Sequence, residues 1–219
     1  ILPPYYDGIV IKLNNFDKLN IKDNEIVVES GYMFNKLSNE LSNMGYTGYE
    51  WSIGIPGTVG GCIYNNAGAY KMSMSDLLIS VTVLKNNEII ELSSFECNFG
   101  YRTSLFKEEK DYIILSCKLK IHKGNIDEIK SLINDRTKRR IETQPLNYPS
   151  CGSVFRNPDN IPAGKLIEDL GLKGYSIGGA CVSTLHANFI INKDNASGED
   201  IIKLINIIKE KAKEKTGID

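Results

Sequence analysis

Apolar and polar residues along the chain follow two different periods, which predict a mixture of strands and helices. Short runs rich in β-branched residues predict strands. These runs cover residues 8–13, 25–29, 78–84, 88–92, 112–121 and 188–192. Asn86 and Asn87, between the third and fourth runs, predict a β-hairpin.

Apolar residues that recur every three or four positions predict helices. One predicted helix starts near Met33 and ends at Gly45, and the others cover residues 126–140, 163–170 and about 197–215. Ser197, with Asp200 three positions later, is typical of a helix N-cap, and Gly217 follows the far end. Because strands in antiparallel-looking groups are mixed with helices, the pattern predicts an α+β fold.

Two prolines indicate how the chain is organised. Pro145 and Pro149 interrupt it after a predicted helix, and we expect domains of residues 1–146 and 147–219. The chain starts at Ile1 without a methionine and stops at Asp219, directly after the last predicted helix. We therefore expect it to be part of a longer protein.

Composition excludes several classes of protein. The chain has 219 residues and a net charge of −1, from 26 basic and 27 acidic residues, with no basic patch for nucleic acid or an anionic membrane. No apolar run reaches the length of a membrane span. Five widely spaced cysteines, without a C-x-x-C pair, predict neither a zinc site nor a disulfide framework, and a reducing cytoplasm is the simplest setting.

Residues 54–61, with the sequence GIPGTVGG, form the most distinctive motif. Four glycines and a proline predict a loop whose main-chain N–H groups approach a ligand, because glycine has no Cβ. A second small-residue turn, NNAGAY, follows at residues 65–70. The lysine of a Walker A loop and the spacing of a Rossmann fingerprint are both missing. The motif indicates the pyrophosphate of a nucleotide cofactor; a glycine-rich turn that binds nothing is the alternative.

Two further segments carry candidate chemistry. Ser153 lies in a proline-bounded segment of small polar residues, where it could be a nucleophile, a proton donor or a plain turn serine. No Gly-x-Ser-x-Gly motif surrounds it, which weakens the nucleophile interpretation. Arg102 follows Tyr101 just past a glycine turn, where its guanidinium could hold a carboxylate or phosphate or lie in solvent.

The other basic candidates are weaker signals. Arg140 lies at the end of a predicted helix, where a positive charge is favourable even without a ligand. We expect His122 to be a surface residue and His186 to make either a buried polar contact or a ligand contact. Neither histidine has a metal-ligating partner at a suitable spacing, so no metal site is predicted.

Taken in order, the motifs resemble those of the UDP-N-acetylenolpyruvoylglucosamine reductase family. GIPGTVGG and NNAGAY are followed by YRTS, QPLNYPSCGSVFRNP, AGKLIEDLGLKGYSIGGACVS and HANFIIN. The resemblance runs from about Gly8 to the end of the chain and is similar to the shorter, type II branch of that family. Any one motif is weak evidence, but their common order makes coincidence improbable.

The resemblance implies a FAD-binding domain of the vanillyl-alcohol-oxidase (PCMH) type and a smaller α+β substrate-binding domain. It implies reduction of UDP-GlcNAc-enolpyruvate to UDP-N-acetylmuramate with NADPH, in peptidoglycan precursor synthesis. Ser153 matches the proton donor, and Arg102 matches the arginine that binds the substrate carboxylate. Substrate-side positions match Tyr101, Arg140, Asn157 and His186. Positions that approach FAD match Gly54, Ile55, Pro56, Gly57, Thr58, Val59, Gly60, Gly61 and Gly68.

Two family segments are missing from this sequence. The resemblance implies a flavin-binding segment before Ile1 and a catalytic glutamate on a strand after Asp219. We therefore expect these 219 residues alone to bind FAD weakly or not at all and to turn over little. Two other interpretations stay open, namely another flavin oxidoreductase of the same superfamily and, for this chain, a non-catalytic nucleotide-binding module.

Overall fold

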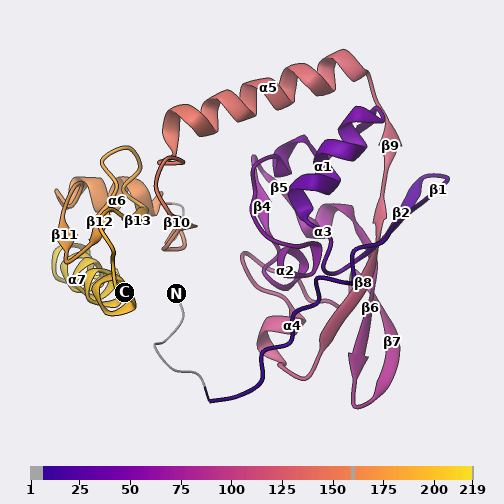
Figure 1. Ribbon diagram of the computed structural model, residues 1–219, viewed down its shortest axis with the longest axis horizontal. Helices are drawn as coiled ribbons and strands as arrows, with labels where there is room; N and C mark the ends of the chain where they lie inside the picture. Colours follow the sequence, from indigo (N-terminus) through magenta and orange to yellow (C-terminus); the bar gives the residue numbers. More distant parts are fainter. Residues whose placement is uncertain (1–6, 159–160, 219) are drawn as a thin grey trace. The chain divides into compact units, whose positions relative to one another are not determined.

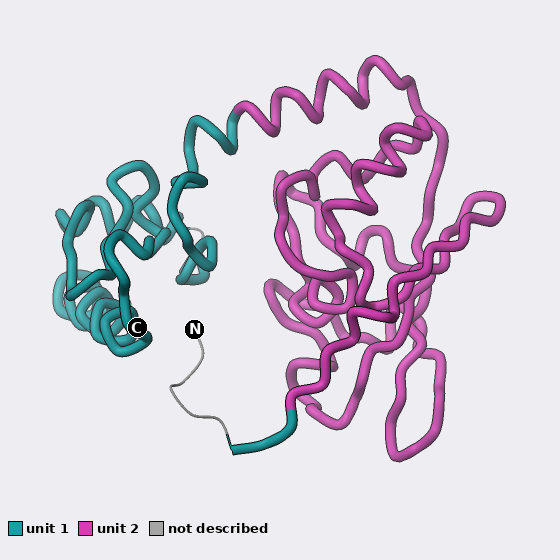
Figure 2. The backbone as a smooth tube through the Cα atoms, in the orientation of Figure 1, with its two compact units in different colours: residues 1–9, 139–219 teal, residues 10–138 magenta. Residues whose placement is uncertain are grey.

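The computed structural model describes residues 7–158 and 161–218, which form two compact units (Figures 1 and 2). Unit 2 comprises Val10–Lys138, and unit 1 comprises Ile1–Ile9 together with Arg139–Asp219. The division falls inside helix α5 (Ile126–Thr143). The boundary expected between residues 146 and 147 stays a prediction. Both end residues, on which the expectation of a longer protein rests, lie outside the described residues.

A five-stranded antiparallel sheet forms the framework of unit 2 (Figure 1). Its strands, in spatial order, are β1 (Leu19–Lys22), β2 (Glu25–Glu29), β8 (Ile113–Lys120), β6 (Leu78–Lys85) and β7 (Glu88–Ser93). Strands β6 and β7 form the predicted hairpin, and Asn86 and Asn87 take the left-handed φ values of 50° and 64° that its tight turn requires.

One face of this sheet is apolar and carries the core of unit 2. Along β2 the burial alternates, so that Ile26 and Val28 point into the core. Helix α1 (Phe34–Asn43) packs there, and the ring of Phe34 meets Trp51 edge-on at 5.6 Å between centroids. Gly45, with φ 77°, follows the end of α1 as predicted.

Short elements connect the sheet to the helices of unit 2. Two antiparallel pairs join β3 (Tyr46–Thr47) to β9 (His122–Lys123) and β4 (Gly68–Ala69) to β5 (Met72–Ser73). The short helices are η1 (Glu50–Ser52), α2 (Val59–Tyr64), α3 (Met74–Leu77) and α4 (Leu105–Glu108). His122 is exposed, as predicted.

Unit 1 is a smaller α+β structure with its own core. Four antiparallel strands lie in the order β10 (Ser150–Ser153), β13 (Phe189–Asn192), β12 (Ala180–Val182) and β11 (Ser176–Ile177). Helices α6 (Ala163–Asp169) and α7 (Gly198–Thr216) supply Ile167, Leu204 and Ile208 to the core. Ser197 and Asp200 form the predicted capping box of α7, and Gly217 follows with φ 74°.

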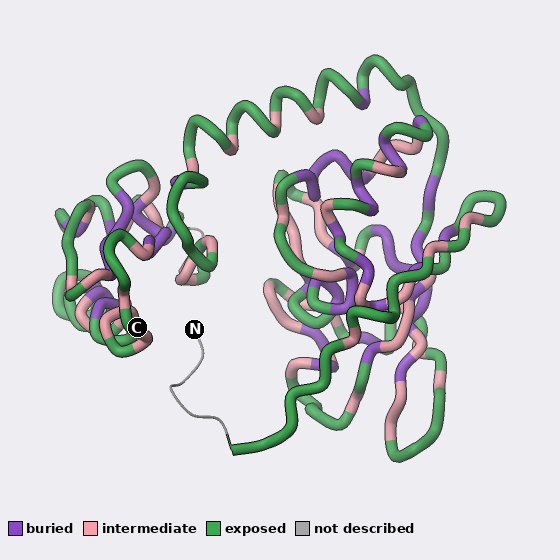
Figure 3. Tube along the Cα trace, viewed as in Figure 1, coloured by how far each residue is buried: buried purple, intermediate pink, exposed green. Residues whose placement is uncertain are grey.

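Three parts of the chain differ from the elements expected from sequence. The strand predicted over residues 8–13 is wrong: the segment is irregular, and Ile9 is 88% exposed (Figure 3). Its β-branched pattern lacks a partner strand within the described residues. Residues 59–64 form helix α2 rather than loop, and residues 150–153 form strand β10. Each of the last two depends on contacts with residues far away in the chain.

The described residues contain no helix that is both long and apolar enough to cross a membrane, and no cluster of three or more metal-ligating side chains. All five cysteines are free. Burial raises the pKa of Cys62 and of Cys97 to about 12, so neither thiol is a ready nucleophile at neutral pH.

Candidate functional site

Helix α2 and the turn before it are held firmly against the end of strand β2. The N–H groups of Val59 and Gly60 donate to the main-chain oxygens of Tyr32 and Ser30, at 2.8 and 2.9 Å. Thr58 caps the helix, because its side-chain oxygen accepts from the N–H of Gly61 at 3.3 Å. The glycine motif is therefore a turn followed by a capped helix.

Two glycines of the motif are required for steric reasons. A Cβ on Gly60 would lie 2.8 Å from the Cβ of Ser30, closer than side-chain atoms approach in proteins. Gly57 has φ 110°, a conformation that other residues rarely adopt. The motif is rich in glycine partly because the chain itself packs closely here.

The prediction that this loop offers a row of free N–H groups is wrong for most of its positions. The N–H of Gly54 donates to the side-chain oxygen of Asn35 at 2.8 Å, and that of Ile55 donates to Ser52 at 2.9 Å. Within the part of the chain that the structure describes, only Gly57 and Thr58 of this motif have N–H groups without a partner in the protein. Any anion contact by the motif's main chain falls mainly on these two positions.

A cavity of about 390 Å³ lies beside α2 in unit 2. It is lined by Thr58, Gly60, Gly61 and Tyr64, with residues from the N-terminal segment, from the end of β2 and from the start of β8. The side-chain oxygen of Ser30 in its wall is buried and has no hydrogen-bond partner among the residues that the structure describes. Because a buried hydroxyl without a partner is unfavourable, Ser30 fits a wall that meets a polar ligand. The other predicted flavin contacts, Gly54, Ile55, Pro56, Gly57, Val59 and Gly68, do not line this cavity.

Arg102 is fixed by the second small-residue turn of unit 2. Its guanidinium donates to the main-chain oxygens of Asn66, at 3.2 Å, and Gly68, at 2.5 Å. The ring of Tyr101, which is 57% exposed, lies 5.4 Å from the guanidinium carbon. Two of the five guanidinium N–H donors are thus used, and the others can bind an anion. Arg102 is half-buried rather than free in solvent.

Several contacts make the turn that carries Arg102 rigid. Arg102 has a left-handed φ of 58°, which is uncommon for a residue with a side chain. The side chain of Asn66 donates to Gly100 at 3.0 Å, and Lys107 donates to the main-chain oxygen of Arg102 at 3.2 Å. The NNAGAY and YRTS motifs therefore form one structure, although more than 30 positions separate the residues that these hydrogen bonds join.

Unit 1 has a cavity of about 360 Å³ that brings together three of the predicted residues. Ser153 ends strand β10, Asn157 follows it, and His186 precedes β13, and all three line this cavity. The side-chain oxygen of Asn157 accepts from the N–H of Ala163 at 3.0 Å, which ties it to the start of α6. Ser153 is exposed, so its hydroxyl is accessible.

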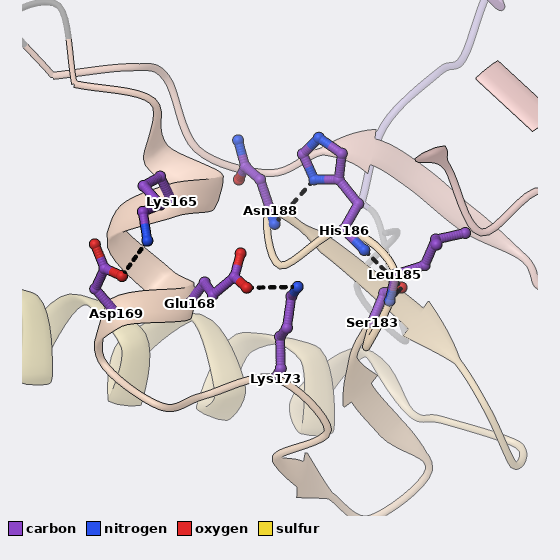
Figure 4. A network of polar contacts seen from close by, with 8 residues as sticks. All are labelled: Lys165, Glu168, Asp169, Lys173, Ser183, Leu185, His186 and Asn188. Carbon is purple, nitrogen blue, oxygen red and sulfur yellow. Dashed lines mark hydrogen bonds and ion pairs between the residues drawn. The ribbon is translucent and has the colours of Figure 1, made fainter. Parts of the chain in front are cut away.

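His186 is half-buried at the edge of this cavity (Figure 4). Its ring lies 4.8 Å from that of Phe189, and a Cβ on Gly164 would lie 3.1 Å from its Cε1 atom. Burial lowers the pKa of His186; a hydrogen bond to the backbone opposes this shift, and the nearby positive charge of Lys173 adds to it. The imidazole is therefore neutral at neutral pH and can donate or accept a hydrogen bond.

The same cavity contains charged residues that the sequence analysis did not single out. Lys165 pairs with Asp169 at 2.6 Å, and Lys173 pairs with Glu168 at 2.9 Å (Figure 4). Lys165 and Glu168 line the cavity. The spacing of Lys165 and Glu168 on a predicted helix could have indicated that both side chains lie on one face. This indication is weak, because such charge pairs are common on exposed helices. Arg140, whose guanidinium reaches Gln144 at 3.5 Å, is not among the residues that line either cavity.

Comparison with known proteins matches two regions of the chain to described protein families. Residues 3–93 match the FAD binding domain, and residues 144–219 match the C-terminal domain of UDP-N-acetylenolpyruvoylglucosamine reductase. A UDP-N-acetylenolpyruvoylglucosamine reductase of Caldanaerobacter subterraneus subsp. tengcongensis is 45% identical over 213 residues, which cover 97% of this chain and 70% of the relative. The chain belongs to the UDP-N-acetylenolpyruvoylglucosamine reductase family.

Further members of this family give the same result. A reductase of this name from Alkaliphilus metalliredigens is 46% identical over 209 residues, which cover 94% of the chain and 68% of the relative. The crystal structure of the family member MurB from Thermus caldophilus superposes with a TM-score of 0.83 at 30% identity, covering 94% of this chain and 73% of that one. The α+β fold and the FAD-binding domain expected from sequence are confirmed.

Family membership agrees with the unit 2 cavity. The residues matched by the FAD binding domain include Ser30 and the whole of α2. The cavity, the unpartnered hydroxyl of Ser30 and the close approach at Gly60 fit part of a dinucleotide, and a volume of about 390 Å³ lies in the range of roughly 300–1,000 Å³ usual for small-ligand sites. This is a flavin-dependent reductase family of peptidoglycan precursor synthesis.

Proposed function

We propose that this chain carries the FAD-binding and substrate-binding machinery for reducing UDP-GlcNAc-enolpyruvate to UDP-N-acetylmuramate with NADPH, in the cytoplasm. The observation that carries the proposal is the unit 1 cavity, where Ser153, Asn157 and His186 meet although 33 positions separate the first from the last. The family resemblance implies that Ser153 is the proton donor and that Asn157 and His186 lie on the substrate side. Their convergence on one cavity supports a common ligand.

FAD, when bound, accepts a hydride from NADPH and donates a hydride to the enolpyruvyl carbon. Thr58, Gly60 and Gly61 would hold it, with the buried hydroxyl of Ser30 as a polar contact. The N–H groups of Gly57 and Thr58 are available to a phosphate oxygen. The other N–H groups of the motif, which bond within the protein, keep this surface in place before the cofactor binds.

The hydroxyl of Ser153 supplies the proton of the reaction. Reduction adds a hydride to one carbon of the enolpyruvyl double bond and a proton to the other, so a donor must face the second carbon. Ser153 is accessible and lies at a strand end next to the cavity. A positioned general acid typically contributes about 10²–10⁴-fold to a rate.

Arg102 stabilises the negative charge that collects on the substrate carboxylate during the reaction. Its guanidinium is held by two main-chain oxygens before substrate binds, and such preorganised charge is effective in catalysis. Asn157 and His186 bind the sugar nucleotide from the unit 1 cavity. Tyr101 and Arg140 contact the substrate outside that cavity, Arg140 at the diphosphate.

The decisive experiment separates the two half-reactions of Ser153→Ala. The full-length protein is loaded with FAD, reduced anaerobically with NADPH, and then mixed with UDP-GlcNAc-enolpyruvate while the flavin absorbance is followed. We expect the variant to be reduced by NADPH like the wild type but to be reoxidised by the substrate about 10²–10⁴-fold more slowly. Ser150→Ala, an exposed serine on the same strand, is the matched control and retains both steps.

Other outcomes separate the rival interpretations. Equal loss of both half-reactions in Ser153→Ala would show that Ser153 has a structural role. Flavin of the full-length wild-type protein that NADPH reduces but UDP-GlcNAc-enolpyruvate never reoxidises would indicate another flavin oxidoreductase. Calorimetric binding of UDP-GlcNAc-enolpyruvate without binding of FAD would indicate a non-catalytic nucleotide-binding module.

A further inference from the structure

Asn188 is a buried polar residue of unit 1 that no sequence motif assigned to the chemistry. It lies directly before strand β13 and is 4% exposed. It lines the unit 1 cavity together with Ser153 and His186. A buried amide needs hydrogen-bond partners, so its contacts show what it holds in place.

Both ends of the Asn188 side-chain amide bind the main chain of Phe155. The side-chain oxygen accepts from the N–H of Phe155 at 2.9 Å, and the side-chain nitrogen donates to its main-chain oxygen at 2.9 Å. The main-chain oxygen of Asn188 also accepts from the N–H of Val154 at 2.9 Å. Three hydrogen bonds from one residue therefore fix the two residues that follow Ser153.

The pairing of strands β10 and β13 is irregular next to Ser153, so other contacts are needed to position this residue. Strand β10 pairs with β13 at Ser150 and again at Ser153, with an irregularity between them. Gly152, inside the irregular part, has φ 80°. Because the regular ladder is interrupted just before Ser153, the serine is positioned by its pairing with Phe189 and by the contacts that Asn188 makes on its other side.

Asn188 also contacts the second cavity residue, His186. The N–H of Asn188 donates to the Nδ1 atom of His186 at 3.3 Å (Figure 4). A ring nitrogen that accepts this bond carries no proton, so in the neutral ring the proton lies on Nε2. His186 then presents an N–H donor rather than an acceptor at its other nitrogen.

We infer that Asn188 is a positioning residue that aligns the Ser153 hydroxyl and holds His186 in the Nε2–H form, so that the cavity presents two hydrogen donors. Donors match a ligand rich in oxygen acceptors, such as a sugar nucleotide with phosphate and carboxylate groups. The choice of this ligand rests on the proposed function. The placement of the two side chains by Asn188 does not.

The test uses the ¹⁵N-labelled 219-residue chain without cofactor or substrate. The chain has two histidines, so comparison with His186→Gln assigns the ring signals of His186, whose ¹⁵N shifts report which nitrogen carries the proton. We expect the Nε2–H form in the wild type. In Asn188→Asp, which retains the oxygen acceptor but loses the side-chain donor to Phe155, we expect faster amide exchange at Val154 and Phe155. The Nε2–H form of His186 should persist in this variant, because its donor is the main-chain N–H of residue 188. Asn192→Ala is the matched control, because Asn192 lies on strand β13, which directly follows Asn188, and its side chain accepts from the N–H of Ala196 at 2.9 Å.

Two results overturn the inference. One is the finding that the neutral ring of wild-type His186 carries its proton on Nδ1. This measurement does not depend on whether any variant folds. The other is a folded Asn188→Asp chain with wild-type amide exchange at Val154 and Phe155, or the same faster exchange in Asn192→Ala.

In the FAD-loaded full-length protein, Asn188→Asp should slow flavin reoxidation by UDP-GlcNAc-enolpyruvate about 10²-fold, the scale of a small misplacement of reacting groups, and leave reduction by NADPH unchanged. Equal slowing of both steps would contradict the positioning role. If the wild type itself shows no reaction with this substrate, the proposed function fails, while the tautomer and exchange measurements still decide the role of Asn188.

Discussion

The guanidinium of Arg102 donates a hydrogen bond to the main-chain oxygen of Gly68, at a position where the main chain of Met72 leaves no room for a side chain. A Cβ on Gly68 would lie 3.3 Å from the Nη1 atom of Arg102 and 2.6 Å from the main-chain oxygen of Met72. The small-residue turn thus positions an arginine, rather than lining the unit 2 cavity as a flavin contact.

Arg102→Lys tests whether this arrangement serves catalysis. A lysine ammonium cannot reproduce the planar fork that reaches both Asn66 and Gly68 while presenting further donors. We expect flavin reoxidation by UDP-GlcNAc-enolpyruvate to fall about 10²–10³-fold, with flavin reduction by NADPH retained. Stopped-flow absorbance measures both steps. Arg139→Lys, at an exposed position, is the control, and an equal effect of Arg102→Lys on both steps would argue for a purely structural role.

Adjacent glycines of α2 should respond in opposite ways to the same substitution. Gly60→Ala places a methyl group 2.8 Å from the Cβ of Ser30, and we expect unit 2 to lose about 1–3 kcal/mol of unfolding free energy. In Gly61→Ala the nearest atom to the new Cβ is 3.6 Å away, and replacing a helical glycine should leave stability unchanged or raise it by up to about 1 kcal/mol. Thermal and denaturant unfolding without FAD measure both. Similar values for the two variants would contradict the close approach at Ser30.

The pH dependence of stability should carry a contribution from His186. Burial lowers its folded pKa below the ordinary 6.5, so the unfolded chain binds the proton more readily. Its stabilising contribution is complete above pH 6.5 and is lost as the pH falls through the folded pKa. Lys173, which lowers this pKa further, and the cavity residues Lys165 and Glu168 are the charged groups nearby.

The measurement compares the unfolding free energy of the wild type and His186→Gln between about pH 7.5 and pH 5. We expect the wild type to lose stability faster on acidification, because glutamine binds no proton. Parallel curves for the two proteins would show that burial does not shift the titration of His186.

Local patterns in the sequence were sufficient for the elements whose signals are local. The capping box of Ser197 and Asp200, the asparagine turn of the β6–β7 hairpin and the glycine after α1 all lie where the sequence predicted them. Each depends on hydrogen bonds or backbone angles within a few residues, so the sequence contains the necessary information. The order of the motifs was likewise sufficient for the family, which the comparisons confirmed.

Only the tertiary structure decided how the motifs are used. The glycines of residues 54–61 were read as open backbone for a ligand, yet Gly60 is needed for close contact with Ser30, 30 positions earlier. Residues 8–13 have the pattern of a strand but are irregular, because a strand also needs a partner. Asn188 stands in the motif HANFIIN, but no pattern assigns it a role, because that role lies in contacts with Phe155, 33 positions away. Pairings across such separations depend on how the whole chain packs, which no local pattern encodes.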